Sequence, residues 1–141
     1  MSYLQNINRW LDNNCYSLTQ FNDLKNLQDL KEKSGYSVSV VIPTLEEEGT
    51  IEYVLNYLIK KLILENKIID ELVVIDGGSK DQTVSKILKL KQENNNFIKF
   101  YSQDEILPKL CQHKGKGEAL WKSLYVTTGD IVIYSDSDIK N

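Results

Sequence analysis

Two carboxylates near the end of the sequence, Asp136 and Asp138, stand one residue apart at the end of an apolar strand predicted to begin at Ile131. Side chains alternate across a strand, so residues two apart point the same way. The carboxylates could therefore converge on one cation, and such hard oxygen ligands suit Mg²⁺ or Mn²⁺. The alternative is a polar turn, because Asp and Ser are ordinary turn residues.

Two further polar segments follow predicted strands. Residues 43–48 (PTLEEE) could hold a planar base on the backbone around Thr44 and Leu45, or they could be a proline stop before an acidic helix start. Residues 76–83 (DGGSKDQT) contain two glycines that would allow a ligand to approach closely. The same glycines suit a tight turn in which Ser79 or a nearby aspartate caps the next helix.

A fourth polar segment, residues 114–118 (KGKGE), precedes a predicted helix. Lys116 lies between two glycines and is well placed to meet a negatively charged ligand, through its ammonium and through the N–H groups of the helix start. The spacing is not that of a Walker A motif, and no G-x-G-x-x-G follows the first strand, which disfavours a dinucleotide-binding domain. His113, the only histidine, is interpreted as a loop residue rather than a ligand or base.

These segments interrupt a regular alternation of strands and helices. Apolar patterns predict strands over residues 38–42, 71–76, 97–101 and from 131 onward, and helices over about 50–62, 81–92 and after 114–117. Such alternation indicates a largely parallel sheet with helices on both faces, so the polar segments should meet at one edge. Residues 1–36 are predicted to form one or two short helices, with Phe21, Leu24 and Leu27 facing the main body.

The composition is that of an ordinary globular domain of 141 residues, with 41% hydrophobic and 26% charged residues. A formal net charge of −3 argues against nucleic acid or an anionic membrane as a partner. We find no signal peptide and no apolar run that could span a membrane. Cys15 and Cys111 form neither a disulfide framework nor a metal-ligand spacing, so a cytoplasmic protein with reduced thiols is expected.

Taken together, the segments resemble nucleotide-sugar-dependent glycosyltransferases of the GT-A fold, and more closely the glucosyl-3-phosphoglycerate synthase family. The likeness is carried by residues 40–51, 74–83, 115–124 and 136–138, of which the block G-K-G-E-A-L-W-x-S-L is the most specific. The resemblance implies an incomplete α/β GT-A (Rossmann-like) sheet, open and mostly parallel. Residues 1–36 would be an N-terminal helical extension and residues 37–141 the nucleotide-sugar-binding half of a truncated domain.

The resemblance also implies roles for individual residues. The donor would be UDP-glucose, with GDP-glucose left open, and Asp138 would be the more direct ligand of Mg²⁺ or Mn²⁺, while Asp136 would reach the ribose, the sugar or the metal. No catalytic residue is assigned. The remaining donor-binding residues would be Pro43, Thr44, Leu45 and Glu47 at the uracil and ribose, Ser79 in the same pocket, and Lys116.

The implied reaction is retaining transfer of glucose to the 2-hydroxyl of 3-phosphoglycerate. A metal would neutralise the departing diphosphate, and Lys116 could add a second positive charge. No nearby carboxylate pair offers the roles needed for glycoside hydrolysis. Glu46 stands where similar enzymes usually have Asn, and we expect this change to be tolerated. The acceptor site and the remaining metal ligand, usually a histidine, would lie beyond Asn141, so an apolar edge should be exposed where they pack.

Several alternatives remain. The chain could belong to an inverting GT-A transferase with a lipid or polysaccharide acceptor, although the G-K-G-E-A-L-W block argues against this. It could also be a non-catalytic nucleotide-binding module; a nucleotidyltransferase is disfavoured because no glycine-rich phosphate loop follows the first strand. A homodimer is a possible assembly. We expect the 141-residue chain alone to bind nucleotide weakly and to turn over little or nothing.

Overall fold

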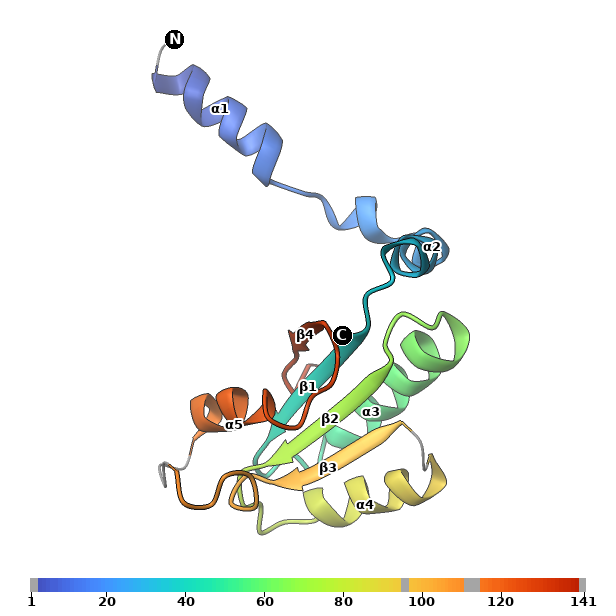
Figure 1. The fold of residues 1–141 in the computed structure, drawn as a ribbon, viewed down its shortest axis with the longest axis vertical. Helices are drawn as coiled ribbons and strands as arrows, with labels where there is room; N and C mark the ends of the chain where they lie inside the picture. Colours follow the sequence, from blue (N-terminus) through green and yellow to red (C-terminus); the bar gives the residue numbers. More distant parts are fainter. Residues whose placement is uncertain (1–2, 95–96, 111–114, 140–141) are drawn as a thin grey trace.

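Four parallel strands form the centre of the molecule (Figure 1). The computed structural model describes residues 3–94, 97–110 and 115–139. In these residues the sheet order is β3-β2-β1-β4, and every neighbouring pair is parallel. The predicted α/β fold with a parallel sheet is confirmed. The strands are β1 (Val38–Thr44), β2 (Glu71–Asp76), β3 (Ile98–Ser102) and β4 (Ile131–Tyr134).

The two central strands, β1 and β2, are buried on both faces, which explains their nearly continuous β-branched and apolar sequences. Their register pairs Thr44 with Asp76, and the next pair of strands aligns Asp76 with Ser102. The carboxyl ends of three strands therefore lie side by side. The polar residues that follow each strand start from this one edge.

Strand β1 continues past Pro43, where the sequence predicted a stop. The Pro43 carbonyl accepts a hydrogen bond from Ser137 Oγ at 3.3 Å, so the proline nitrogen also faces the side of β4. Pairing between β1 and β4 ends at Val41 and Tyr134. No ladder donor is needed at Pro43, because its neighbour on that side is a loop rather than a strand.

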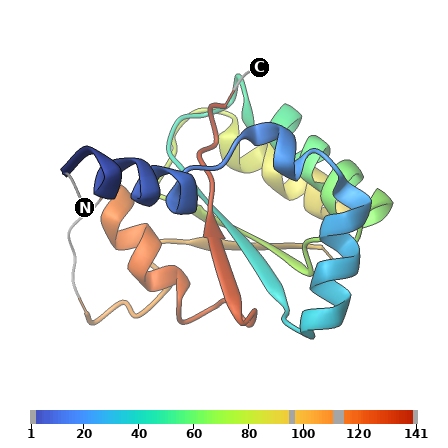
Figure 2. The ribbon, with the colours of Figure 1, turned by 90° about the horizontal axis from the view of Figure 1, so that it is seen from above.

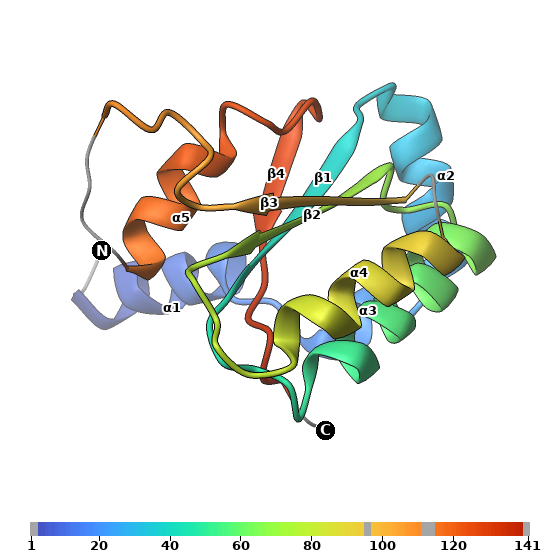
Figure 3. The same cartoon turned by 90° about the horizontal axis from the view of Figure 1, so that it is seen from below.

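Helices cover both faces of the sheet (Figures 2 and 3). Helices α3 (Ile51–Leu58) and α4 (Thr83–Glu93) lie on one face, and α5 (Lys116–Ser123) lies on the other. Alternate residues of β1 divide between two apolar cores: Val40 and Ile42 pack beneath α3 and α4, whereas Val41 packs with Ala119 of α5. The predicted helix over about residues 50–62 is instead α3 followed by a π-helical segment, η2 (Ile59–Glu65).

The N-terminal segment contains α1 (Tyr3–Asn14), the 3-10 helix η1 (Leu18–Phe21) and α2 (Leu24–Ser34). Helix α1 has no buried residue and extends away from the sheet (Figure 1). Leu24 and Leu27 are half-buried, but Phe21 is exposed and packs edge-on against Tyr16. The expectation that Phe21 faces the main body is therefore wrong. The division at residues 36 and 37 stays a prediction.

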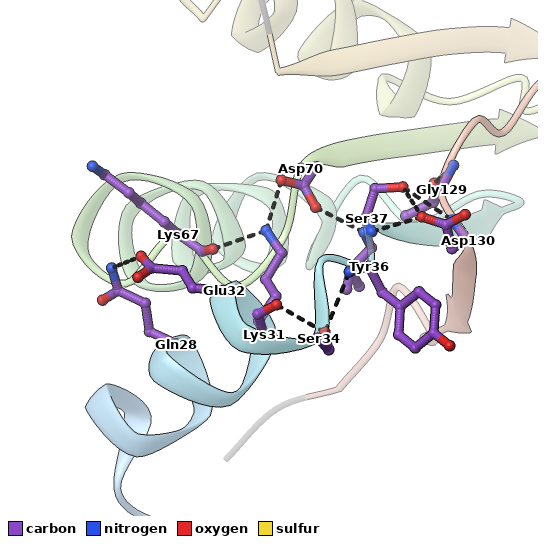
Figure 4. Close-up of polar contacts among 12 residues, drawn as sticks. Gln28, Lys31, Glu32, Ser34, Tyr36, Ser37, Lys67, Asp70, Gly129 and Asp130 are labelled. Atoms are coloured by element: carbon purple, nitrogen blue, oxygen red, sulfur yellow. Dashed lines mark hydrogen bonds and ion pairs between the residues drawn. The ribbon is translucent and has the colours of Figure 1, made fainter.

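Charged side chains tie α2 to the amino-terminal edge of the sheet (Figure 4). The Lys31 ammonium lies 2.6 Å from Asp70 Oδ1 and donates to the Lys67 carbonyl at 3.0 Å. Asp70 also accepts from the backbone N–H that opens β1. Beside it, the backbone N–H and the hydroxyl of Ser37 donate to Asp130 at 2.9 and 2.7 Å, which lowers the pKa of Asp130. These bonds align β1 with β2 and β4.

A buried carboxylate lies at the same edge. Glu71 is 7% exposed and accepts hydrogen bonds from Ser39 Oγ, Lys99 Nζ and both the N–H and hydroxyl of Thr128. Burial alone would raise the pKa of Glu71, but the bonds from Lys99, Thr128 and Ser39 outweigh it and lower the pKa. Gly129 follows, and a Cβ there would lie 2.7 Å from Ser39 N. Only glycine allows this close approach.

Strand β4 has a partner on one side only among the described residues. Ile131, Ile133 and Tyr134 are between 43% and 45% exposed, so the expected apolar edge is present. Within the described ranges, no helix has both the length and the apolar character needed to cross a membrane.

Candidate functional site

A cavity of about 310 Å³ opens at the carboxyl edge of the sheet. It brings together residues from five separate parts of the sequence. Ser79 is the only predicted site residue that does not line it. The lining includes the predicted site residues Pro43, Thr44, Leu45, Glu47, Lys116, Asp136 and Asp138. The structure thus collects these side chains around one space, and the role of each stays a prediction.

Ser79 is not among the residues that line the cavity, and it holds two loops together. Its hydroxyl donates to Asp76 Oδ1 at 2.5 Å and accepts from the backbone N–H of Glu46 at 2.8 Å. Asp76 also accepts from the N–H groups of Gly78 and Ser79, and from Thr44 Oγ1 at 3.3 Å. Ser79 therefore fixes the loop after β1 rather than contacting the space itself. Its assignment to a nucleotide pocket stays a prediction.

The acidic loop before α3 is anchored to the start of α4. The backbone N–H of Glu47 donates to Thr83 Oγ1 at 2.8 Å, and Glu47 Oε2 accepts from Thr50 Oγ1 at 3.0 Å. Glu48 and Asp81 cross-link the same two elements through backbone N–H groups. A hydrogen bond from the Thr83 hydroxyl is the main cause of a lowered pKa at Asp81. The loop that lines the cavity is therefore held in one conformation.

The two aspartates lie on a loop rather than on a strand. Strand β4 ends at Tyr134, so strand alternation does not orient Asp136 and Asp138 as the sequence suggested. Instead, Ser137 is buried and its hydroxyl donates to the Pro43 carbonyl. Asp136 and Asp138 flank this anchored residue and line the cavity together with it. A loop bond, not strand geometry, therefore brings both aspartates to the cavity, and their convergence on one cation stays a prediction.

Lys116 and Asp136 form an ion pair at the cavity. Their side chains are 59% and 52% exposed, so an incoming ligand can reach both groups. Lys116 comes from the first residue of α5, while Asp136 follows β4. The pair gives the cavity a cationic and an anionic group at adjacent positions.

The donor atoms present fit a divalent cation of the Mg²⁺ or Mn²⁺ type. Asp136 and Asp138 supply hard carboxylate oxygens on one cavity, and ions of this type usually keep several waters and bind phosphate oxygens. In the part of the chain that the structure describes, no three His, Cys, Asp or Glu side chains form a metal-binding group. A metal bound by these two aspartates would need further ligands, such as water or phosphate oxygens.

Five lining residues were not predicted from the sequence. Gly77 and Gln103 form one part of the wall: a Cβ on Gly77 would lie 3.4 Å from the Thr44 carbonyl oxygen and 3.8 Å from Gln103 Oε1. Gln103 directly follows β3, so the rule that sheet ligands gather at strand ends could have identified it. His113 and Lys114 lie outside the described residues. The other unpredicted lining residues are Gly115, Ala119 and Ser137.

Comparison with known proteins shows which protein family the sequence matches. Residues 39–140 match the family model described as Glycosyl transferase family 2. The chain is 43% identical over 123 residues to the glucosyl-3-phosphoglycerate synthase of Petrotoga mobilis. The aligned segment covers 87% of this chain and 36% of that protein.

Solved structures of two enzymes are among those similar to the chain. Glucosyl-3-phosphoglycerate synthase from Mycobacterium tuberculosis, in complex with Mn²⁺, UDP-glucose and phosphoglyceric acid, has a TM-score of 0.66 and 39% identity over 84% of this chain and 38% of that one. Another crystal of that enzyme contains Mg²⁺ and UDP. Mannosyl-3-phosphoglycerate synthase from Rubrobacter xylanophilus has a TM-score of 0.81 and 29% identity over 94% of this chain and 40% of that one. The chain thus spans between 36% and 40% of the length of these relatives.

Proposed function

Because the chain belongs to glycosyl transferase family 2, we propose that it forms the donor-binding part of a glucosyltransferase that uses UDP-glucose and 3-phosphoglycerate. The observation that carries the proposal is the single cavity on which Lys116, Asp136 and Asp138 meet the loop after β1. A nucleotide sugar needs such a mixture: a surface for a flat base beside a charged region for the diphosphate.

The base and ribose would lie against Pro43, Thr44 and Leu45. The structure supports this because the loop is held from behind by Ser79 and by the start of α4, so it needs little reordering on binding. Glu47 lines the same part of the cavity and offers a carboxylate to a ribose hydroxyl.

The diphosphate would lie near Lys116 and the two aspartates. Asp138 and Asp136 would hold Mg²⁺ or Mn²⁺, which when bound supplies positive charge against the departing diphosphate. The ammonium of Lys116, at the start of α5, would place a second positive charge near the diphosphate. A bound metal would replace Lys116 as the partner of Asp136. The lysine ammonium would then be available to a phosphate oxygen.

The acceptor assignment rests on the relatives. The Petrotoga mobilis and Mycobacterium tuberculosis proteins are named as glucosyl-3-phosphoglycerate synthases, and the latter has been crystallised with phosphoglyceric acid. Residues 115–124, the most specific part of the resemblance, build α5 and one side of the cavity. The retaining outcome and the acceptor are proposals for a complete enzyme.

A nucleotide titration tests the donor assignment. UDP with Mn²⁺ should raise the unfolding midpoint of the chain and bind measurably by calorimetry, whereas ADP with Mn²⁺ should bind more weakly. Asp138→Asn should remove the part of the UDP response that depends on Mn²⁺, and Asp29→Asn, an exposed residue on α2, should leave it unchanged. Equal responses of the wild type and Asp138→Asn would rule out the proposed metal-assisted site.

A further inference from the structure

A buried ion pair lies directly behind the cavity on α5. The Lys122 side chain is 2% exposed, and its ammonium lies 2.5 Å from Glu118 Oε1. The same ammonium donates a hydrogen bond to the backbone carbonyl of Gln103 at 3.1 Å. Neither Lys122 nor Glu118 lines the cavity, so none of the donor contacts proposed above uses this pair.

Stability alone does not account for the pair. Removing two charges from water costs several kcal/mol per ion, and their attraction offsets this only when the remaining polar atoms are hydrogen-bonded. Glu118 Oε2 has no hydrogen-bond partner, and it is the only such buried side-chain atom among the described residues. Two apolar side chains of similar size would fill the same space without that cost. The pair is more readily explained by what it holds in place.

What it holds is Gln103, a residue of the cavity wall. The Gln103 N–H donates to the Asp76 carbonyl at 2.9 Å, and its carbonyl accepts from Lys122, so both backbone groups are fixed. The Gln103 side chain is almost fully buried, and Oε1 lies 3.8 Å from the Cβ position of Gly77. Gln103 and Gly77 line the cavity together.

The same contact also joins α5 to the residue that directly follows β3. Lys116 and Ala119 lie on the cavity side of α5, about two turns and about one turn before Lys122, respectively. This bond therefore connects the helix that carries Lys116 to the cavity wall that carries Gln103, through a residue that does not itself line the cavity.

We propose that Lys122 is a positioning residue of the nucleotide cavity: its buried ammonium, neutralised by Glu118, holds the Gln103 carbonyl and so fixes the Gln103–Gly77 wall against α5. The inference rests on the proposed binding of a nucleotide sugar. The ligand concerned is the same as in the proposed function, UDP or UDP-glucose. The affinity for this ligand should therefore depend on Lys122 and Glu118, although neither residue lines the cavity.

The test compares two variants: one loses the buried ion pair within α5, and the other loses an ion pair between β3 and β2. Lys122→Met combined with Glu118→Gln removes both buried charges. Lys99→Met removes the ion pair with Glu71, which is 2.7 Å long and lies near the opposite edge of the sheet. UDP with Mn²⁺ is titrated calorimetrically into each chain, well below its unfolding midpoint. The stoichiometry reports the folded fraction, so partial unfolding is separated from a change in affinity.

We expect the double variant to bind UDP roughly tenfold more weakly than the wild type, because small displacements of a positioned wall weaken binding by this order. Lys99→Met should lower the unfolding midpoint but change the UDP affinity by less than about twofold. If the double variant binds UDP as tightly as the wild type, or if Lys99→Met loses as much affinity, the positioning role is wrong and the donor site stands. If the wild type does not bind UDP, the proposed function and this inference both fall.

Discussion

The ammonium of Lys116, at the start of α5, is ion-paired with the carboxylate of Asp136, which lies in the loop after β4. Twenty residues of sequence separate them, and the fold brings them together on one cavity. The pair means that a cation already lies beside Asp136 before any metal binds. A metal and Lys116 should therefore compete for Asp136 unless a phosphate group is present to receive the lysine.

Replacing Lys116 tests this competition. Lys116→Gln should bind Mn²⁺ alone at least as tightly as the wild type, because Asp136 loses its competing cation. The same variant should bind UDP with Mn²⁺ roughly tenfold more weakly, because a charge-assisted contact to the diphosphate is lost. Mn²⁺ binding is measured by electron paramagnetic resonance and UDP binding by calorimetry. Lys89→Gln, an exposed residue on α4, is the control for charge, and identical behaviour of the two variants would contradict the prediction.

Ser79→Ala tests the support of the loop after β1. The change removes one partner of the Glu46 N–H and one of Asp76, so the free energy of unfolding should fall by about 1–3 kcal/mol. UDP affinity should fall as well, because the loop is no longer held before binding. Urea unfolding and calorimetry give the two values. Ser85→Ala, which removes an exposed hydroxyl on α4, should change the free energy of unfolding and the UDP affinity only slightly. If Ser79→Ala changed neither value, the loop would be held by its other bonds.

The buried Glu71 predicts acid sensitivity. Its pKa is lower in the folded chain than the ordinary value of 4.5, because bonds from Lys99, Thr128 and Ser39 favour the carboxylate over the opposing effect of burial. The folded state thus binds this proton less tightly than the unfolded state does. The stabilising contribution is complete above pH 4.5 and is lost as the pH falls through the lower, folded-state pKa.

Glu71→Gln measures that contribution. At pH 7 the variant should unfold more easily than the wild type by about 1–3 kcal/mol, and the difference should shrink as the pH falls below 4.5. Urea unfolding at several pH values gives the comparison. Glu65→Gln, which removes only an exposed ion pair with Lys61, should show a much smaller difference. A difference for Glu71→Gln that stays constant with pH would contradict the assignment.

Gly129→Ala should destabilise the chain by a steric mechanism. The new methyl group would lie 2.7 Å from the backbone nitrogen of Ser39, and backbone cannot move aside as the end of a side chain can. We expect a loss of about 1–3 kcal/mol in the free energy of unfolding. Gly49→Ala is the matched control, because nothing lies within 4 Å of its Cβ position. Equal urea midpoints for the two variants would show that the Gly129 turn can relax.

The residue pattern was sufficient to predict the order of strands and helices and the edge at which the polar segments meet. Strand β2 has the predicted bounds, because its apolar run is bounded by Glu71 and Asp76 and must be buried on both faces. The segments that carry Thr44, Lys116 and Asp136 were also identifiable, because strand ends in a parallel sheet share one edge. These inferences depend only on local periodicity and on the topology it implies.

Other features depend on contacts between residues far apart in the sequence, and only the tertiary structure determined them. The bonds by which Ser79 joins Asp76 to the backbone N–H of Glu46 had no signal in the sequence. The Gln103 carbonyl accepts a hydrogen bond from Lys122, nineteen residues later, and no sequence pattern indicated that bond. Periodicity describes which side of an element is buried; it does not describe which hydroxyl or ammonium satisfies a given backbone group. That choice is made by packing, in which the large majority of buried polar atoms are hydrogen-bonded.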